Sequence, residues 1–369
     1  MRSLVFSTIP FEFEPMPSDT YIVDNNLFGN NVGNMFFFNA AVKSLRCETH
    51  EIIRYEEGMC LNDYDFGIFI QANQIRNGTL EWINNDYNLI KGCKIPFVIV
   101  CIGTDSTPDF NTYLNQDVID SYYRCYSEIL CRTSSIGVRG DWTKKVLVEQ
   151  IGLPEERIDV IGCPSVRYFG RDLKKFSRNY SNFDKEMKIA VNFTAYHYDD
   201  DEAIYLYKLL KEYRNSYIVF TDKVEADLLW KGINVPQNRQ HELLPTTVNH
   251  FMMKQDRCRF IATQQEIMTM FKTFDFSIGS RIHQAIISII SGCPALLIAH
   301  STRVLEIAEY HNIPYILRTE LVETQPSLET LYYRACTGMI KFYKSYDDKL
   351  VEYTNFLKKN NLIVNPDYN

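Results

Sequence analysis

The regular alternation of short apolar runs with longer amphipathic segments is the feature that most restricts the fold of this chain. In the second half, the runs that predict buried strands are 188–193, 216–221, 259–263, 274–279, 295–299 and 315–317. The segments that predict helices between them are 200–214, 264–274, 282–292 and 302–312. Alternation of strand and helix at this spacing is typical of a doubly wound parallel sheet.

The first half of the chain shows the same alternation in a less regular form. Strands are predicted at 66–71, 95–103, 134–140 and 157–164, and helices at 34–45 and 141–152. The continuous apolar run "IPFVIVCIG" favours a central strand that is covered on both faces. Asp141 is the predicted N-cap of the second helix, and Gly152 is its predicted stop.

A polar, charged segment at 174–187 contains few aliphatic residues and is predicted to link two halves. We therefore expect an α/β protein with an N-terminal domain over 1–180 and a C-terminal domain over 181–326, both Rossmann-like. The tail over 327–369 is predicted to be helical and to pack back on the body. Parallel sheets of this type bind ligands at the carboxyl ends of their strands, so the site is expected in a cleft between the domains.

Composition excludes several classes of function. A net charge of -7 and a pI near 5.6 argue against a general nucleic-acid binder, and an anionic ligand would need locally placed cations. The ten cysteines include no C-x-x-C pair, so no zinc site is expected. The start of the chain lacks a cleavable signal pattern, and the apolar run 285–299 is too short and too interrupted to span a bilayer. A reducing, cytoplasmic location is expected.

Arg281 and His283 are the first candidates for a functional site, because they directly follow the predicted strand 274–279. Ligand-binding groups in such sheets lie where a strand ends and its helix begins. An extended joint would direct positions two apart into one pocket, beside the positive end of the helix. The alternative is structural: an arginine that caps or forms an ion pair, and a hydrogen-bonded core histidine.

Arg303 and Arg139 occupy similar joints between strand and helix. Arg303 is near the predicted start of the helix at 302–312, where a cation is unfavourable unless an anion offsets it. That anion is either a ligand or Glu306, one turn further along. Arg139 ends the strand at 134–140, and Asp141 offers it a purely structural bridge.

Two other segments carry weaker signals. In "FGNNVGNMFF" (28–37), Gly33 and Asn34 begin a helix whose free backbone N–H groups would donate to a phosphate or carboxylate. The segment matches neither the dinucleotide nor the Walker pattern, and an ordinary turn is the alternative. In "VIGCPSVR", Cys163 is a possible nucleophile, but the absence of a histidine nearby in sequence favours a buried structural thiol.

Together these segments resemble the polysaccharide pyruvyl transferase family. The most specific part is a Gly-x-Arg-x-His motif, followed by an Arg-x-x-Glu helix and Ile-Pro. Gln284, Gly140 and Asn34 stand where other residue types are common in the family, so no acceptor preference is carried over. The segments that carry the resemblance are "NNVGNMFFFNAAVKSL", "SIGVRGDWTKKVLVEQIG", "VIGCPS", "DFSIGSRIHQAI" and "SGCPALLIAHSTRVLEIAEYHNIP".

The resemblance implies two Rossmann-like domains whose parallel sheets face a cleft, similar to the GT-B glycosyltransferases. It implies a phosphoenolpyruvate-dependent ketal-pyruvyltransferase, which transfers pyruvate to a sugar of a bacterial-type polysaccharide or its precursor. No metal or organic cofactor is expected, and neither a nucleic-acid partner nor a transmembrane segment. A lipid-linked acceptor would bring the protein to the inner face of the membrane.

The reaction assigns roles to the candidate residues. Arg139 and Arg281 are expected to clamp the donor, because guanidinium groups bind oxyanions in a bidentate manner. His283 is the expected general acid for the methylene carbon. The residues expected to complete substrate binding are Arg303, Gly33, Asn34, Ser280 and His300.

Three other functions are compatible with parts of this pattern. A GT-B-type glycosyltransferase would use a nucleotide sugar, and many such enzymes bind it with two glutamates at a fixed spacing that no pair after residue 190 reproduces. A non-catalytic glycan-binding relative would keep the fold alone. A dinucleotide-dependent oxidoreductase is disfavoured because the fingerprint glycines are missing.

Overall fold

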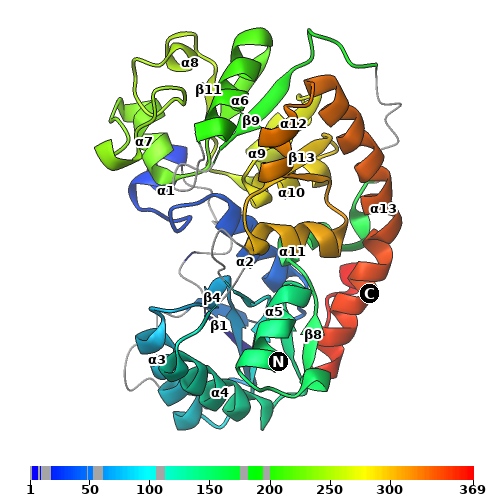
Figure 1. Cartoon of the computed structure of the whole chain (residues 1–369). Coiled ribbons are helices and arrows are strands. Elements are labelled where there is room, and N and C mark those ends of the chain that lie inside the picture. The colour runs from blue at the N-terminus through cyan, green and yellow to red at the C-terminus, as the bar shows by residue number, and fades with distance from the viewer. Residues whose placement is uncertain are drawn as a thin grey trace.

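The computed structural model describes residues 2–6, 9, 18–47, 49–52, 61–104, 113–174, 182–193 and 200–369. Within this part of the chain, two lobes are each built on a parallel sheet, and a long C-terminal helix runs along both (Figure 1). The α/β class with parallel sheets that the sequence predicts is therefore confirmed. Half of the predicted linker, residues 175–181, lies outside the described residues.

The sheet of the first lobe has the strand order β2-β1-β3-β5, and all of its neighbours are parallel. Two shorter parallel pairs, β4 with β6 and β7 with β8, continue this lobe, and a bridge between Ile102 and Val138 joins β7 to the segment after β5. The strands are β1 (Arg2–Phe6), β2 (Thr49–Ile52), β3 (Phe66–Ile70), β4 (Asn73–Ile75), β5 (Phe97–Val100), β6 (Gly103–Thr104), β7 (Ile136–Val138) and β8 (Ile158–Val160).

Strand β5 is covered on both faces, as predicted, but it is the last strand of the order β2-β1-β3-β5 rather than a central one. Phe97 and Ile99 pack in the core that α3 (Leu80–Gly92) and α4 (Gln116–Leu130) form on one face of the sheet. Val98 and Val100 belong instead to the large core that continues into the second lobe. On that side lies α2 (Gly33–Lys43), which packs against the 3₁₀ turn Pro164–Arg167.

The sheet of the second lobe has the order β11-β10-β9-β12-β13-β14, again with parallel neighbours throughout. Counted from its first strand, this is the doubly wound order 3-2-1-4-5-6, whose direction reverses between β9 and β12. The predicted strands of this half are thus confirmed. Their bounds are β9 (Ile189–Asn192), β10 (Ser216–Val219), β11 (Cys258–Arg259), β12 (Phe276–Gly279), β13 (Ala295–Ala299) and β14 (Tyr315–Leu317).

The helices of the second lobe cover both faces of its sheet (Figure 1). Helix α10 is apolar on nearly every side because it packs between its own sheet, α2 and the turn Pro164–Arg167. Helix α10 therefore lies at the interface between the two lobes. The helix bounds are α6 (Asp200–Glu212), α7 (Lys223–Lys231), α8 (Phe251–Lys254), α9 (Gln264–Phe271), α10 (Ile282–Ile290), α11 (Thr302–His311) and α12 (Arg318–Thr324).

Two helices connect the lobes in ways that chain order alone does not suggest. Helix α13 (Leu328–Lys359) contacts the second lobe through Tyr343, whose hydroxyl donates to the carbonyl of Ile289 over 3.1 Å. At its other end, the side-chain oxygen of Asn360 accepts from the backbone N–H of Ser135 in the first lobe (3.1 Å). Helix α1 (Asp19–Asp24) precedes α2 but lies beside α7 (Figure 1).

Among the helices of the described residues, none combines the length and the apolar composition that a membrane span needs.

Glu306 of α11 provides a buried polar link between the lobes. Its carboxylate accepts from the backbone N–H of Thr143 (3.0 Å) and from the Thr143 hydroxyl (2.9 Å). These bonds serve the N-terminus of α5 (Asp141–Lys145), which continues into a π turn at Val146–Gln150. The predicted N-cap, Asp141, was wrong: Gly140 is the N-cap, and a carboxylate from the other lobe satisfies the helix terminus.

The stability of the protein should fall with rising pH because of Glu306. Burial raises the pKa of Glu306 to about 7, against the lowering effect of Thr143 and Arg139. A folded-state pKa above the unfolded value means that the stabilisation is complete below the unfolded pKa and lost as pH rises through about 7. Relative to Glu306→Gln, wild-type protein should lose on the order of 3 kcal/mol between about pH 4 and about pH 8.

Urea unfolding of both proteins across this range measures the difference. Other titrating groups contribute equally to both proteins and cancel. A difference in unfolding free energy that stays constant with pH would mean that folding does not change the pKa of Glu306.

Candidate functional site

The candidate site lies at the carboxyl ends of β9 and β12, where the strand order of the second sheet reverses. Such a reversal leaves a crevice because the connections on its two sides leave toward opposite faces. Here the side-chain oxygen of Asn192, at the end of β9, accepts from the backbone N–H of Arg281 (2.8 Å). A Cβ at Gly279 would overlap the backbone oxygen of Asn192, so only glycine permits this close approach.

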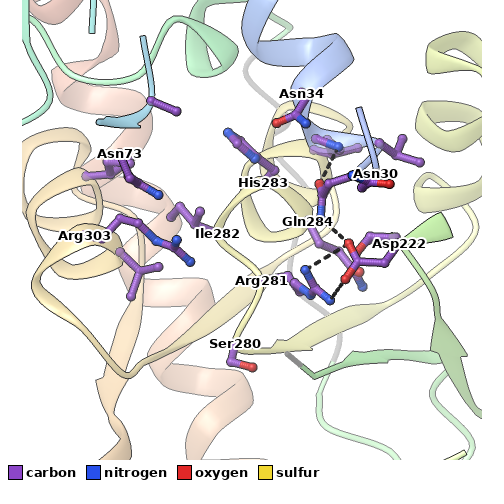
Figure 2. Close-up of a pocket in the computed structure, with 18 of the residues that line it drawn as sticks. Asn30, Asn34, Asn73, Asp222, Ser280, Arg281, Ile282, His283, Gln284 and Arg303 are labelled. Atoms are coloured by element: carbon purple, nitrogen blue, oxygen red, sulfur yellow. Dashed lines mark hydrogen bonds and ion pairs between the residues drawn. The ribbon is translucent and has the colours of Figure 1, made fainter. Parts of the chain in front are cut away.

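A cavity of about 360 Å³ opens between the lobes at this point. Figure 2 shows His283 between two groups of polar side chains, Arg303 with Asn73 on one side and Arg281 with Asp222 on the other. The sequence therefore predicted correctly that residues of both halves meet here. The polar and glycine residues that line the cavity are Asn30, Asn31, Gly33, Asn34, Asn73, Arg139, Thr221, Asp222, Ser280, Arg281, His283, Gln284 and Arg303.

Arg281 is engaged by carboxylates rather than left open to a ligand. Its guanidinium forms a bidentate ion pair with Asp222, at 3.1 Å for the longer contact, and its Nη2 lies 3.7 Å from Glu225. Its Nε donates to the carbonyl of Phe193 (3.0 Å). This arrangement corresponds to the structural interpretation of Arg281, although the residue does line the cavity.

Asp222 and Glu225 also organise the start of α7 as a capping box. The Glu225 carboxylate accepts from the backbone N–H groups of Thr221 (2.8 Å) and Asp222 (2.9 Å). Burial and the charge of Asp222 raise the pKa of Glu225 to about 7, although Arg281 opposes the shift. Asp222 additionally accepts from the side-chain amide of Asn31 (2.6 Å), which belongs to the segment before α2.

Arg139 enters the cavity from the first lobe and is only 3% exposed. Its Nε donates to the carbonyl of Cys101 (3.2 Å), and its Nη1 donates to the side-chain oxygen of Asn73. The guanidinium also lies 5.6 Å from the ring centre of Phe37. Asn73 and Cys101, rather than Asp141, thus orient this arginine, and neither partner neutralises its charge.

His283 lies in the first turn of α10 and faces α2. Its ring packs so closely on Gly33 that a Cβ there would overlap the imidazole. The ring of Phe37 follows one turn later, 6.2 Å away between centroids. On another side, Nε2 lies 3.9 Å from the sulfur of Cys163, so a histidine distant in sequence does approach this cysteine.

The other predicted residues divide into two groups. Ser280, Arg303 and the Gly33–Asn34 pair line the cavity, whereas His300 is not among the described residues that line it. The hypothesis of free N–H groups at the start of α2 is wrong. The N–H of Gly33 donates to the side chain of Asn31 (2.8 Å), and that of Asn34 to the Asn31 carbonyl (3.0 Å).

Sequence reasoning missed Asp222, Asn73 and Asn192. Asp222 had a readable signal, since the D-x-x-E pattern after a predicted strand indicates a capping box. The two asparagines had none, because their roles depend on strands that become neighbours only in the folded sheets.

The two-lobed fold and the interlobe cavity together define a GT-B-like protein. The sequence matches the profile of the polysaccharide pyruvyl transferase family over residues 31–302. Since the match covers most of the chain, the protein belongs to this family, whose members are transferases that modify polysaccharides. No protein of curated function matches the sequence significantly.

The comparison with solved structures bears on the fold alone. HepE of Anabaena, in complex with UDP and glucose, aligns with a TM-score of 0.52 at 9% identity, covering 97% of this chain and 99% of HepE. UDP-GlcNAc 2-epimerase from Neisseria meningitidis aligns with a TM-score of 0.40 at 12% identity, over 100% and 96% of the two chains. The wall teichoic acid polymerase TagF gives 0.44 at 11% identity, over 98% and 89%. The alignment with HepE confirms the predicted GT-B-like fold.

The Arg281–Asp222 pair should contribute strongly to stability. Its side chains are 13% and 5% exposed, so removing one charge leaves the other buried without its partner. We expect Asp222→Asn to lower the free energy of unfolding by about 3 kcal/mol. In the Asp222→Asn background, Arg281→Met should lower the free energy of unfolding by much less than it does in the wild-type protein.

A double-mutant cycle by urea unfolding measures this coupling. The exposed pair of Arg334 and Glu320, whose side chains are 39% and 41% exposed, is the matched control and should couple by less than about 1 kcal/mol. Additive effects of the two buried substitutions would show that the pair is not formed.

Proposed function

We propose that this protein transfers pyruvate from phosphoenolpyruvate to a sugar of a polysaccharide or its precursor, forming a pyruvate ketal. The observation that supports this most directly is a single interlobe cavity that Arg139, Arg303 and His283 all line. Membership of the pyruvyl transferase family supplies the class of reaction. The cavity supplies cations for a small anion and an imidazole that can donate and accept protons.

The donor would bind between the lobes through Arg139 and Arg303. Phosphoenolpyruvate carries a phosphate and a carboxylate on one small body, and guanidinium groups suit both. The side chain of Asn73 and the Cys101 carbonyl orient Arg139 in the cavity. The sequence predicted that Arg281 binds the donor. In this proposal Arg281 instead pairs with Asp222, which holds the segment before α2 against the second lobe.

His283 would act as the general acid. It donates a proton to the methylene carbon of the enol, which leaves an oxocarbenium-like centre at C2 that one acceptor hydroxyl attacks. The proton of that hydroxyl returns to the imidazole. Phosphate then leaves with the bond to C2, and a second hydroxyl closes the ketal as its proton passes to the released phosphate. No metal or organic cofactor takes part in this scheme.

The acceptor is proposed as a glycan that reaches the cavity from solution or from a lipid carrier. A lipid-linked acceptor would bring the protein to a membrane surface as a peripheral protein, with a cytoplasmic location. The partners of the site are thus phosphoenolpyruvate and a sugar.

Phosphate release from phosphoenolpyruvate, measured against a panel of glycans, tests the function. At least one glycan should stimulate release, and phosphoenolpyruvate alone should raise the melting temperature of the protein. Stabilisation by nucleotide sugars, without an effect of phosphoenolpyruvate, would favour a glycosyltransferase instead. Stabilisation by glycans alone would favour a non-catalytic binding protein.

Substitutions separate binding from chemistry. His283→Ala should abolish ketal formation while phosphoenolpyruvate still stabilises the protein, because the proton donor is lost and the arginines remain. Arg303→Met should weaken phosphoenolpyruvate binding by at least about tenfold, the loss expected for one charge-assisted contact. Arg171→Met, which removes an exposed arginine of the same charge, is the control and should bind normally. Near-normal turnover by His283→Ala would rule out His283 as the acid.

A further inference from the structure

The backbone of Cys163 is fixed by hydrogen bonds on both sides of the residue. It is fully buried in the turn between β8 and the 3₁₀ segment Pro164–Arg167. Its backbone N–H donates to Nε2 of His311 (2.9 Å), which comes from α11 in the other lobe, and its carbonyl accepts from Arg167 (3.4 Å). Both lobes therefore determine where its sulfur lies.

The sulfur of Cys163 lies 3.4 Å from the hydroxyl of Ser165, to which the thiol can donate, and other nearby groups favour its anionic form. Nε2 of His283 lies 3.9 Å away. Burial alone would raise the pKa of the Cys163 thiol, but hydrogen bonds from Cys101 and His283, with the charges of His283 and Arg139, lower it well below its ordinary value. Burial and the contact with Cys163 raise the pKa of Cys101, so Cys101 is the protonated donor of the two cysteines.

We propose that Cys163 is the positioning residue of His283: its thiolate accepts a hydrogen bond from Nε2, which leaves Nδ1 as the atom that delivers the proton in the cavity. This inference rests on the proposed function for the identity of the acid, and on the contact between Cys163 and His283 for everything else. Nδ1 is the ring nitrogen that lies against Gly33, and Gly33 lines the cavity. Nε2 thus lies toward the buried sulfur, and Nδ1 lies against the backbone of a residue of the cavity wall.

The arrangement accounts for the protons of the reaction. In the imidazolium, Nε2–H donates to the sulfur and Nδ1–H faces the donor substrate. After Nδ1 gives its proton to the methylene carbon, the neutral ring keeps the Nε2–H tautomer, which the thiolate stabilises as acceptor. The first acceptor hydroxyl then returns a proton to Nδ1. The sulfur itself forms no bond to substrate, in keeping with the absence of Cys163 from the described residues that line the cavity.

The experiment compares wild type with Cys163→Ser and Cys163→Ala. Serine keeps a small polar side chain but does not ionise near neutral pH, so both variants lose the anion. We expect kcat to fall by about tenfold or more in both, while KM for phosphoenolpyruvate changes by less than about threefold. Cys125→Ala, which removes a buried thiol of α4 far from the cavity in the fold, is the control for loss of core volume and should keep its kcat.

A readout independent of turnover separates this inference from the proposed function. Nitrogen-15 NMR of the histidine rings should show His283 in the Nε2–H tautomer in the neutral wild-type protein, and a changed tautomer ratio in Cys163→Ser. That change should appear even if no glycan stimulates phosphate release, a result that would defeat only the proposed function. An unchanged ring spectrum with an unchanged kcat in Cys163→Ser would overturn the positioning role.

Discussion

The need to pair every charge that is buried where the two lobes meet is the constraint on which the structure depends. A carboxylate or guanidinium taken out of water is tolerated only when an opposite charge or several hydrogen bonds replace the solvent. At this boundary the partners come from distant parts of the chain. Asp222 receives Arg281 and Asn31, and Glu306 receives the start of α5. Arg281 and Asp222 both belong to the second lobe, whereas the contacts of Asn31 with Asp222 and of Glu306 with α5 join the two lobes and are lost if the lobes separate.

That arrangement also determines which cations remain for a ligand. Arg281 and Arg139 line the same cavity, but their surroundings differ in charge. Arg281 is matched by a carboxylate, whereas Arg139 is held by an amide and a backbone carbonyl that orient it without neutralising it. An acidic protein can therefore present a local positive charge in a cleft by holding an arginine with uncharged hydrogen-bond partners, although the charges of Arg139 and Glu306 also interact.

Much of the fold was predictable, and the exceptions have physical causes. Strand β5 was predictable because every one of its residues is apolar, as expected for a strand between two cores. Helix α4 was not predicted, although its buried residues Val118, Tyr122, Cys125 and Ile129 recur at helical spacing. The cap of α5 was misassigned to Asp141 because its actual partner, Glu306, lies in the other lobe. Cys163 was interpreted without a histidine because His283 is 120 residues away.

The sequence by itself determined the parallel α/β class, the two sheets and the joints at which Arg139, Arg281, His283 and Arg303 lie. These features follow from the period of apolar residues and from strand ends, which are local properties of the chain. The tertiary structure alone decided which arginine is neutralised, which nitrogen of His283 faces Cys163, and how the start of α2 satisfies its N–H groups. Those outcomes depend on pairs of groups that are far apart in sequence and are brought together only when the two lobes pack, so no local pattern encodes them.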